Sequence, residues 1–134
     1  MKNEELARRA VACRHWQWAP GVLTLEEIMP PAITLGWDAA RVLHADEGEA
    51  VRVCTVLGKI RDIHATALPD LSDPCTLGAL LALVREAWGD PHLHVGRRIA
   101  GWGVWTSQST PLPECVGKGD TEPEALVAAL EAAP

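Results

Sequence analysis

The stretch "LPDLSDPCTLGALLALVREAWGDP" constrains the fold of this chain more than any other part of the sequence. Asp73 is a favourable N-cap, Pro74 suits the first helical position, and Gly89 followed by Pro91 ends a helix. Between them the apolar residues recur at the spacing of one helical face: Leu77, Leu80, Leu81, Val84 and Trp88. This pattern predicts an amphipathic helix that packs its apolar face on a sheet.

Two shorter helices are expected at the ends of the chain. Asn3 followed by two glutamates is typical of a helix start, and apolar residues then recur at helical spacing, so we expect a helix over residues 3 to 14. Near the C-terminus, Thr121 and Glu124 form a capping-box pattern ahead of a second apolar face.

The segments between the helices have features of antiparallel strands. Residues 41–45 and 50–56 read as a hairpin around an acidic turn, and residues 92–95 and 99–106 as a second pair around Gly96-Arg97-Arg98. "HWQWAPGVLTL" reads as a strand, a turn at Pro20-Gly21 and a continuation. Apart from the first hairpin, residues 26–62 have no assigned topology.

The order of helix, strands, helix, strands and helix predicts an α+β fold, in which an antiparallel sheet is covered by three helices in a layered sandwich. The length of 134 residues is that of one domain, so residues 1–134 are expected to form a single domain.

Composition restricts the partners and the compartment. The formal charge of −6 disfavours a duplex nucleic acid partner, which needs Lys and Arg to neutralise phosphates. No apolar run is long enough for a membrane span or a signal peptide, so we expect a cytoplasmic protein without a membrane partner. The four cysteines have no paired spacing, which favours reduced, packed thiols.

The helical stretch quoted above, the Trp-containing strand pair and "GDTEPEALVAALEAAP" together resemble a group of small proteins encoded by tailed phages and prophages. That group is similar to the phage α-β-α sandwich domain. "WQWAPGVLT" near the N-terminus adds to the resemblance. The resemblance implies the fold and a phage origin, in the cytoplasm of a host cell, and it carries no catalytic residues to this chain.

The strongest candidate site is an anion or nucleotide site around "RRIAGWGVWT". Arg97 and Arg98 lie beside Trp102 and Trp105, and guanidinium groups near indole rings bind phosphates and stack on bases. Because the two tryptophans are three residues apart on a strand, they are expected to face opposite sides of the sheet. One of them then packs under a helix, and the other is available to a ligand.

Three further residues are candidates for the same ligand. Trp18 offers another indole, while Lys118 and Thr121 belong to "GKGDT", which is expected to open the last helix with free N–H groups suited to a phosphate. In every part of this region the ordinary alternative is packing or a solvated turn.

Other chemistries have weaker signals. His92 and His94, with Cys13 and His15, suggest a zinc site but lack a second close pair of ligands. His64 in "IHAT" matches half of a two-histidine phosphoesterase pattern. Cys75 at the start of the second helix is a weak nucleophile candidate that two nearby aspartates would oppose. We therefore assign no catalytic residue, no metal and no cofactor.

These features favour a non-enzymatic phage accessory protein that counteracts host defence. Its sharpest form is a sponge that sequesters a nucleotide-derived immune signal, such as a cyclic oligonucleotide or an ADP-ribose derivative. A homo-oligomer would help to enclose the ligand. Two alternatives remain open: an inhibitor that binds a host defence protein directly, and a phosphoesterase that uses His64 with His92 or His94.

Overall fold

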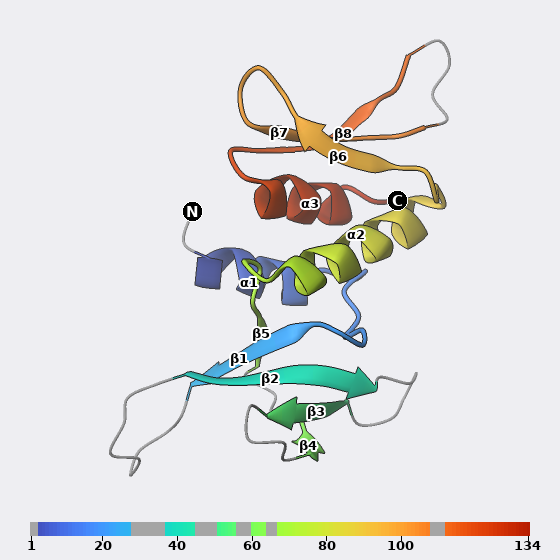
Figure 1. Cartoon of the computed structure of the whole chain (residues 1–134). Coiled ribbons are helices and arrows are strands. Elements are labelled where there is room, and N and C mark those ends of the chain that lie inside the picture. The colour runs from blue at the N-terminus through green and yellow to red at the C-terminus, as the bar shows by residue number, and fades with distance from the viewer. Residues whose placement is uncertain (1–2, 28–36, 45–50, 56–59, 64–66, 108–111) are drawn as a thin grey trace. The chain divides into compact units, whose positions relative to one another are not determined.

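The computed structural model describes residues 3–27, 37–44, 51–55, 60–63, 67–107 and 112–134 (Figure 1). The chain divides into two compact units. The central unit is Trp18–Ala79, and the terminal unit combines Met1–Gln17 with Leu80–Pro134. Helices and antiparallel strands occur together, so the expected α+β class is confirmed. The strands form two sheets, where one was expected.

The central unit is an antiparallel sheet with the strand order β4-β3-β2-β1-β5. The strands are β1 (Leu23–Glu27), β2 (Trp37–His44), β3 (Arg52–Thr55), β4 (Ile60–Asp62) and β5 (Leu68–Pro69). Strands β2 and β3 pair as the sequence predicts, although β2 begins earlier, at Trp37. The expected acidic turn between them, residues 46–49, lies outside the described residues.

The core of the central unit follows from strand alternation. Val42 lies directly opposite Val53, and both are almost fully buried, whereas Arg52 is exposed. Val22 and Ala40 complete this cluster, and Trp18 packs against it. The alternation of Val53 with Arg52 is therefore the half-buried pattern that the sequence predicts.

Asp73 joins the sheet of the central unit to the start of helix α2 (Pro74–Trp88). Its carboxylate accepts hydrogen bonds from the Thr76 backbone N at 2.8 Å and from both terminal nitrogens of Arg41 at 3.1 Å. The Arg41 hydrogen bonds lower the pKa of Asp73 below its usual value, and the Thr76 donors act in the same direction. The predicted N-cap is thus also one half of a salt bridge to β2.

The terminal unit contains a three-stranded antiparallel sheet with the order β6-β7-β8. Its elements are α1 (Asn3–Ala12), residues 80–88 of α2, β6 (His94–Arg97), β7 (Trp102–Trp105), β8 (Cys115–Gly119) and α3 (Glu122–Glu131). Helix α3 contacts all three strands and also α1, and Figure 1 shows the strands along one side of it. The described helices of this unit leave the other side of the sheet uncovered (Figure 1).

Helix α3 begins with the predicted capping box. The Thr121 hydroxyl accepts the backbone N–H of Glu124, and the Glu124 carboxylate accepts the N–H of Thr121. Five residues of α3 are buried: Ala125, Leu126, Val127, Ala129 and Leu130. Trp88 of α2 donates its indole N–H to the carbonyl of Ala129 at 2.8 Å, which ties α2 to α3 inside this unit.

Strand β8 corrects the expectation that Gly117–Thr121 is a loop opening the last helix. Lys118 lies in β8, paired with Gly103 of β7. A Cβ on Gly117 would lie 2.7 Å from the backbone N of Ala129, and one on Gly119 would lie 2.7 Å from that of Ala125. The glycines therefore let α3 approach the sheet closely, which in the sequence looks like a turn signal.

The turn between β6 and β7 also differs from the expected Gly96-Arg97-Arg98. Arg97 belongs to β6 and pairs with Trp102, and the turn is closed by a hydrogen bond from the N of Arg98 to the carbonyl of Gly101. Gly101 has φ +81, a conformation that favours glycine. The turn is therefore set by Gly101, while Gly96 lies inside the strand.

Two smaller corrections concern strand and helix ends. The segment with Trp16 and Trp18 is not a strand, because a turn follows α1 and the next strand begins at Leu23. Strand β6 starts at His94, so His92 lies in the preceding turn. Within the described residues, no helix has the length and apolar character needed to cross a bilayer.

Candidate ligand-binding face

The two faces of the β6-β7-β8 sheet differ in what covers them. Trp102 pairs with Gly119, whose missing side chain would point into α3, so Trp102 lies on the face toward that helix. Residues directly opposite each other in an antiparallel pair share a face. The opposite face, away from α3, carries Gly103, with Lys118 beside it in register.

The indole of Trp105 lies on this second face, next to Gly96 and Gly103. A Cβ on Gly103 would come within 2.8 Å of the Trp105 ring, and one on Gly96 within 3.6 Å of it. These two glycines are cross-strand partners. The absence of a side chain at Gly103 lets the indole lie across the strands, and Trp105 remains half-exposed.

Three other residues lie on the same face as this indole: His94, Arg98 and Lys118. His94 pairs with Trp105 across the strands, and their rings stack with centroids 5.6 Å apart and planes 19° from parallel. The Cδ of Arg98 would lie 2.7 Å from a Cβ on Gly103, so the Arg98 stem lies beside the Trp105 ring. His94, Arg98 and Lys118 are exposed. We call the four residues His94, Arg98, Trp105 and Lys118 the Trp105 face.

The Trp105 face offers two positive charges next to two stacked rings. Among the described residues, the salt bridges join Arg8 to Glu4, Arg9 to Glu131 and Arg41 to Asp73, and none involves Arg98 or Lys118. Both cations therefore stay available to an anion from solvent. Flat aromatic surfaces flanked by cations bind bases by stacking and phosphates by charge.

Asp90 holds the hairpin at the end where His94 and Trp105 meet. Its buried carboxylate accepts hydrogen bonds from the hydroxyl of Ser107 at 2.5 Å, the N of Ser107 at 2.7 Å and the N of His92 at 3.1 Å. The hydroxyl of Ser107 is the main cause that lowers the pKa of Asp90. Asp90 thereby fixes the chain just before β6 and just after β7, a role that no local sequence pattern indicates.

Arg97 and Trp102 form a separate pair on the side of α3. The Arg97 guanidinium carbon lies 5.6 Å from the centre of the Trp102 ring, which is a cation–π contact. Arg97 and Arg98, which the sequence suggests as one site, therefore lie on opposite faces of the β6-β7-β8 sheet. Arg98 goes with Trp105, and Arg97 with Trp102.

The remaining predicted residues have other surroundings. Trp18 belongs to the central unit, where it packs against Val22, Ala40, Val42 and Val53. The side chain and N–H of Thr121 both form the capping box with Glu124. Its hydroxyl and N–H thus serve the helix, and they are not part of the Trp105 face.

The structure places most of the histidines and cysteines that the sequence suggests for metal binding or acid–base chemistry. His64 lies outside the described residues, His92 is exposed in a turn, and His94 stacks on Trp105. Cys75 is exposed and Cys13 is half-buried. No group of three or more His, Cys, Asp or Glu side chains arranged for a metal ion occurs in the part of the chain that the structure describes.

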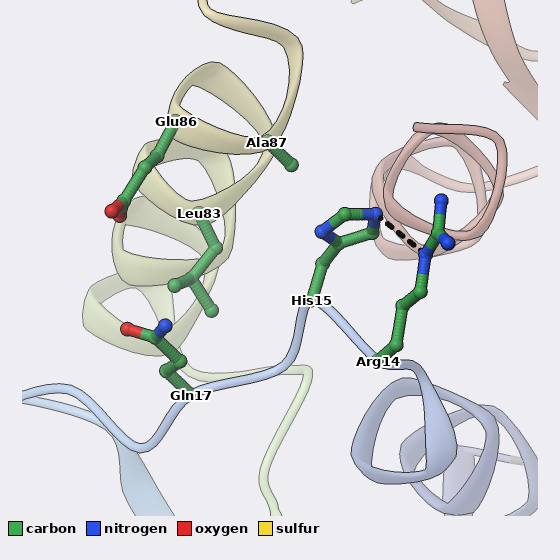
Figure 2. Close-up of a pocket in the computed structure, with 6 residues that line it drawn as sticks. All are labelled: Arg14, His15, Gln17, Leu83, Glu86 and Ala87. Carbon is green, nitrogen blue, oxygen red and sulfur yellow. Dashed lines mark hydrogen bonds between the residues drawn. The ribbon is translucent and has the colours of Figure 1, made fainter. Parts of the chain in front are cut away.

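Two cavities lie in the terminal unit, away from the Trp105 face. One of about 430 Å³ is lined by Ala82, Arg85, Glu86, Gly89 and Pro91. The other, of about 300 Å³, lies between the turn after α1 and the second half of α2 (Figure 2). His15, one of the residues considered for zinc, lines the second cavity, and no residue of the Trp105 face lines either of them.

Comparison of the chain with protein-family models, with curated proteins and with solved structures gave no match. The residues of the Trp105 face are therefore the basis for a functional assignment.

Proposed function

We propose that this protein is a non-enzymatic binding protein that sequesters a nucleotide-derived ligand on the Trp105 face. The observation that carries the proposal is the Trp105 indole, which lies over Gly96 and Gly103 and stacks on His94, with Arg98 beside it and Lys118 on the same face of the sheet. A base or adenine ring stacks on the indole, and the phosphates pair with the two cations. A cyclic oligonucleotide or an ADP-ribose derivative has both parts.

This chemistry agrees with the function expected of a phage accessory protein that removes a host immune signal. A sponge needs binding without turnover, and stacking with ion pairing supplies binding alone. The overall charge of −6 leaves Arg98 and Lys118 as a local basic site on an acidic protein, which favours a small anion over a nucleic acid duplex.

The test is an uptake experiment with the full chain. The protein is incubated with a cyclic oligonucleotide or ADP-ribose, separated from free ligand and heated, and the released nucleotide is identified by chromatography. Recovery of the intact ligand is the expected result. An altered product would instead indicate a hydrolase, and no uptake would contradict the sponge.

Matched variants locate the site. Arg98→Gln and Lys118→Gln should each weaken uptake about tenfold, because each removes a charged hydrogen-bond donor from the ligand. Arg97→Gln removes the same charge from the neighbouring residue on the other face and should leave uptake unchanged. Equal losses for Arg97→Gln and Arg98→Gln would show that the ligand does not bind on the Trp105 face.

One observation favours the second candidate, direct binding to a host defence protein. Ile99, in the turn between β6 and β7, is a large apolar side chain that is fully exposed and that a protein partner could cover. If uptake fails, Ile99→Asp is the variant that should abolish binding to such a partner.

A further inference from the structure

The cavity of about 300 Å³ in the terminal unit has a polar wall and an apolar wall (Figure 2). The chain after α1 and the second half of α2 each supply three lining residues: Arg14, His15 and Gln17 from the first, and Leu83, Glu86 and Ala87 from the second. Its volume is at the lower end of the range for small-molecule sites. No residue of the Trp105 face lines it, so the cavity is a separate candidate site.

A hydrogen bond between neighbouring residues fixes the donor that His15 offers to the cavity. The Nε–H of Arg14 donates to the Nε2 of His15 at 3.1 Å. A guanidinium nitrogen can only donate, so this Nε2 accepts with its lone pair, and the neutral ring carries its proton on Nδ1. Figure 2 shows Nδ1 on the side of the ring that faces Leu83. A ligand in the cavity must therefore bring an acceptor to the Nδ1–H.

Arg14 acts on that acceptor through the His15 ring. Its Nη2 donates to the carbonyl of Ala133 at 3.2 Å, which holds the guanidinium at the Nε2 edge of the ring, away from Nδ1. Hydrogen bonds in a chain polarise one another, so the cation behind the ring makes the Nδ1–H a stronger donor. A strong donor with a positive charge behind it favours an anionic acceptor over a neutral one.

Gln17 supplies a second donor to the same cavity. Its side chain is exposed, and Figure 2 shows its amide nitrogen on the side that faces His15. An amide nitrogen carries two N–H groups, and rotation of the exposed side chain can direct one of them at a ligand. Two N–H donors, one from His15 and one from Gln17, match the two oxygens of a carboxylate.

The wall on α2 is apolar where it faces His15. Leu83 is 7% exposed and Ala87 is half-buried, and both turn toward His15 in Figure 2. Glu86 is exposed, and Figure 2 shows its carboxylate on the side of α2 away from His15 and Arg14, where it opposes a bound anion least. The part of a ligand that lies against α2 therefore meets aliphatic groups.

We propose that this cavity binds a small aliphatic carboxylate, an anion with one carboxylate group and a short apolar tail. The carboxylate accepts the Nδ1–H of His15 and an amide N–H of Gln17. The tail lies on Leu83 and Ala87. The proposal does not depend on nucleotide binding at the Trp105 face.

The test is an NMR titration of the ¹⁵N-labelled full chain with 4-methylpentanoate, following the backbone amides of Gln17 and Ala87. Two comparison compounds each lack one feature: 4-methylpentanamide lacks the charge, and acetate lacks the aliphatic tail. We expect saturable shifts with 4-methylpentanoate and about tenfold weaker binding of each comparison compound. The absence of a saturable shift with 4-methylpentanoate, or an equal affinity for either comparison compound, would overturn the proposal.

Variants test the assigned groups. His15→Phe keeps a ring but removes the donor, and should weaken binding of 4-methylpentanoate about tenfold, whereas His92→Phe in an exposed turn should have no effect. Ala87→Leu fills the cavity and should abolish binding, so it decides the matter if His15→Phe fails to fold. An affinity for 4-methylpentanoate that Ala87→Leu leaves unchanged would overturn the proposal.

Discussion

At the scale of single residues, Gly96 and Gly103 show how a missing side chain can build a surface. Both lie under the indole of Trp105, but at different distances from it. A Cβ on Gly103 would come within 2.8 Å of the ring and 2.7 Å of the Arg98 stem, whereas a Cβ on Gly96 would make an ordinary contact at 3.6 Å. The Trp105 face therefore depends on Gly103 more than on Gly96.

The two glycines give a matched pair of variants. Gly103→Ala should push the indole off the strands, lower the free energy of unfolding by about 1 to 3 kcal/mol and weaken nucleotide uptake. Gly96→Ala should leave both nearly unchanged. Thermal unfolding and tryptophan fluorescence measure the effect, and an equal response of the two variants would contradict the assigned position of the ring.

Asp73 gives a second prediction at this scale. Asp73→Ala removes the N-cap of α2 and should lower the free energy of unfolding by about 1 to 2 kcal/mol, measured by urea denaturation. Asp120→Ala, at an exposed position, is the control and should be neutral. A neutral Asp73→Ala would show that the cap contributes nothing to stability.

The lowered pKa of Asp73 fixes the sign of its pH dependence. The carboxylate contributes stability that is fully present above its unfolded-state pKa of about 3.9 and is lost as the pH falls through the lower folded-state pKa. The stability difference between the wild type and Asp73→Asn should therefore shrink between about pH 5 and about pH 2. A difference that grows on acidification would contradict this account.

At the scale of elements, helices could be predicted well and strand ends poorly. The caps at Asp73 and Thr121 are local patterns, so the sequence alone places the starts of α2 and α3. The positions of strand β8 and of the turn before β7 depend on the surroundings of their glycines. Residues distant in the sequence form those surroundings. Gly117 and Gly119 face α3, and no pattern within β8 distinguishes that role from a turn.

Close packing of α3 on β8 predicts opposite effects for two glycine substitutions. Gly117→Ala places a Cβ against the backbone of Ala129 and should lower the free energy of unfolding by about 1 to 3 kcal/mol. Gly78 is exposed in α2 with no atom near its missing Cβ, so Gly78→Ala should raise it by about 1 kcal/mol. Denaturant unfolding of both variants measures the difference, and stabilisation by Gly117→Ala would contradict the packing.

The candidate site was predicted in part. The sequence indicates that Trp102 and Trp105 face opposite sides, but it cannot say which one is on the face toward α3. That choice depends on the register of β7 with β8, which pairs Trp102 with Gly119. For the same reason Arg97 and Arg98 look equivalent in the sequence and differ in the structure. The hydrogen bonds between Asp90 and Ser107 join residues 17 positions apart, so no local sequence pattern indicates them.

At the scale of the whole molecule, composition bounds the partners more than it identifies them. The net charge of −6 opposes the approach of an anionic ligand, and Arg98 and Lys118 must overcome it locally. Salt screens exposed charges, with a Debye length of about 10 Å at 0.1 M and about 3 Å at 1 M. Nucleotide uptake should therefore weaken as salt rises over this range, and uptake that is insensitive to salt would contradict ion pairing at the Trp105 face.

The most direct test of the central claim is the indole N–H signal of Trp105 in an NMR titration with a cyclic oligonucleotide or ADP-ribose. The signal is assigned by comparison with a Trp105→Leu variant. We expect saturable movement of the Trp105 signal with little change at Trp102, and loss of that saturation in the Arg98→Gln, Lys118→Gln double variant. Saturable binding that moves Trp102 and leaves Trp105 unchanged would contradict the claim.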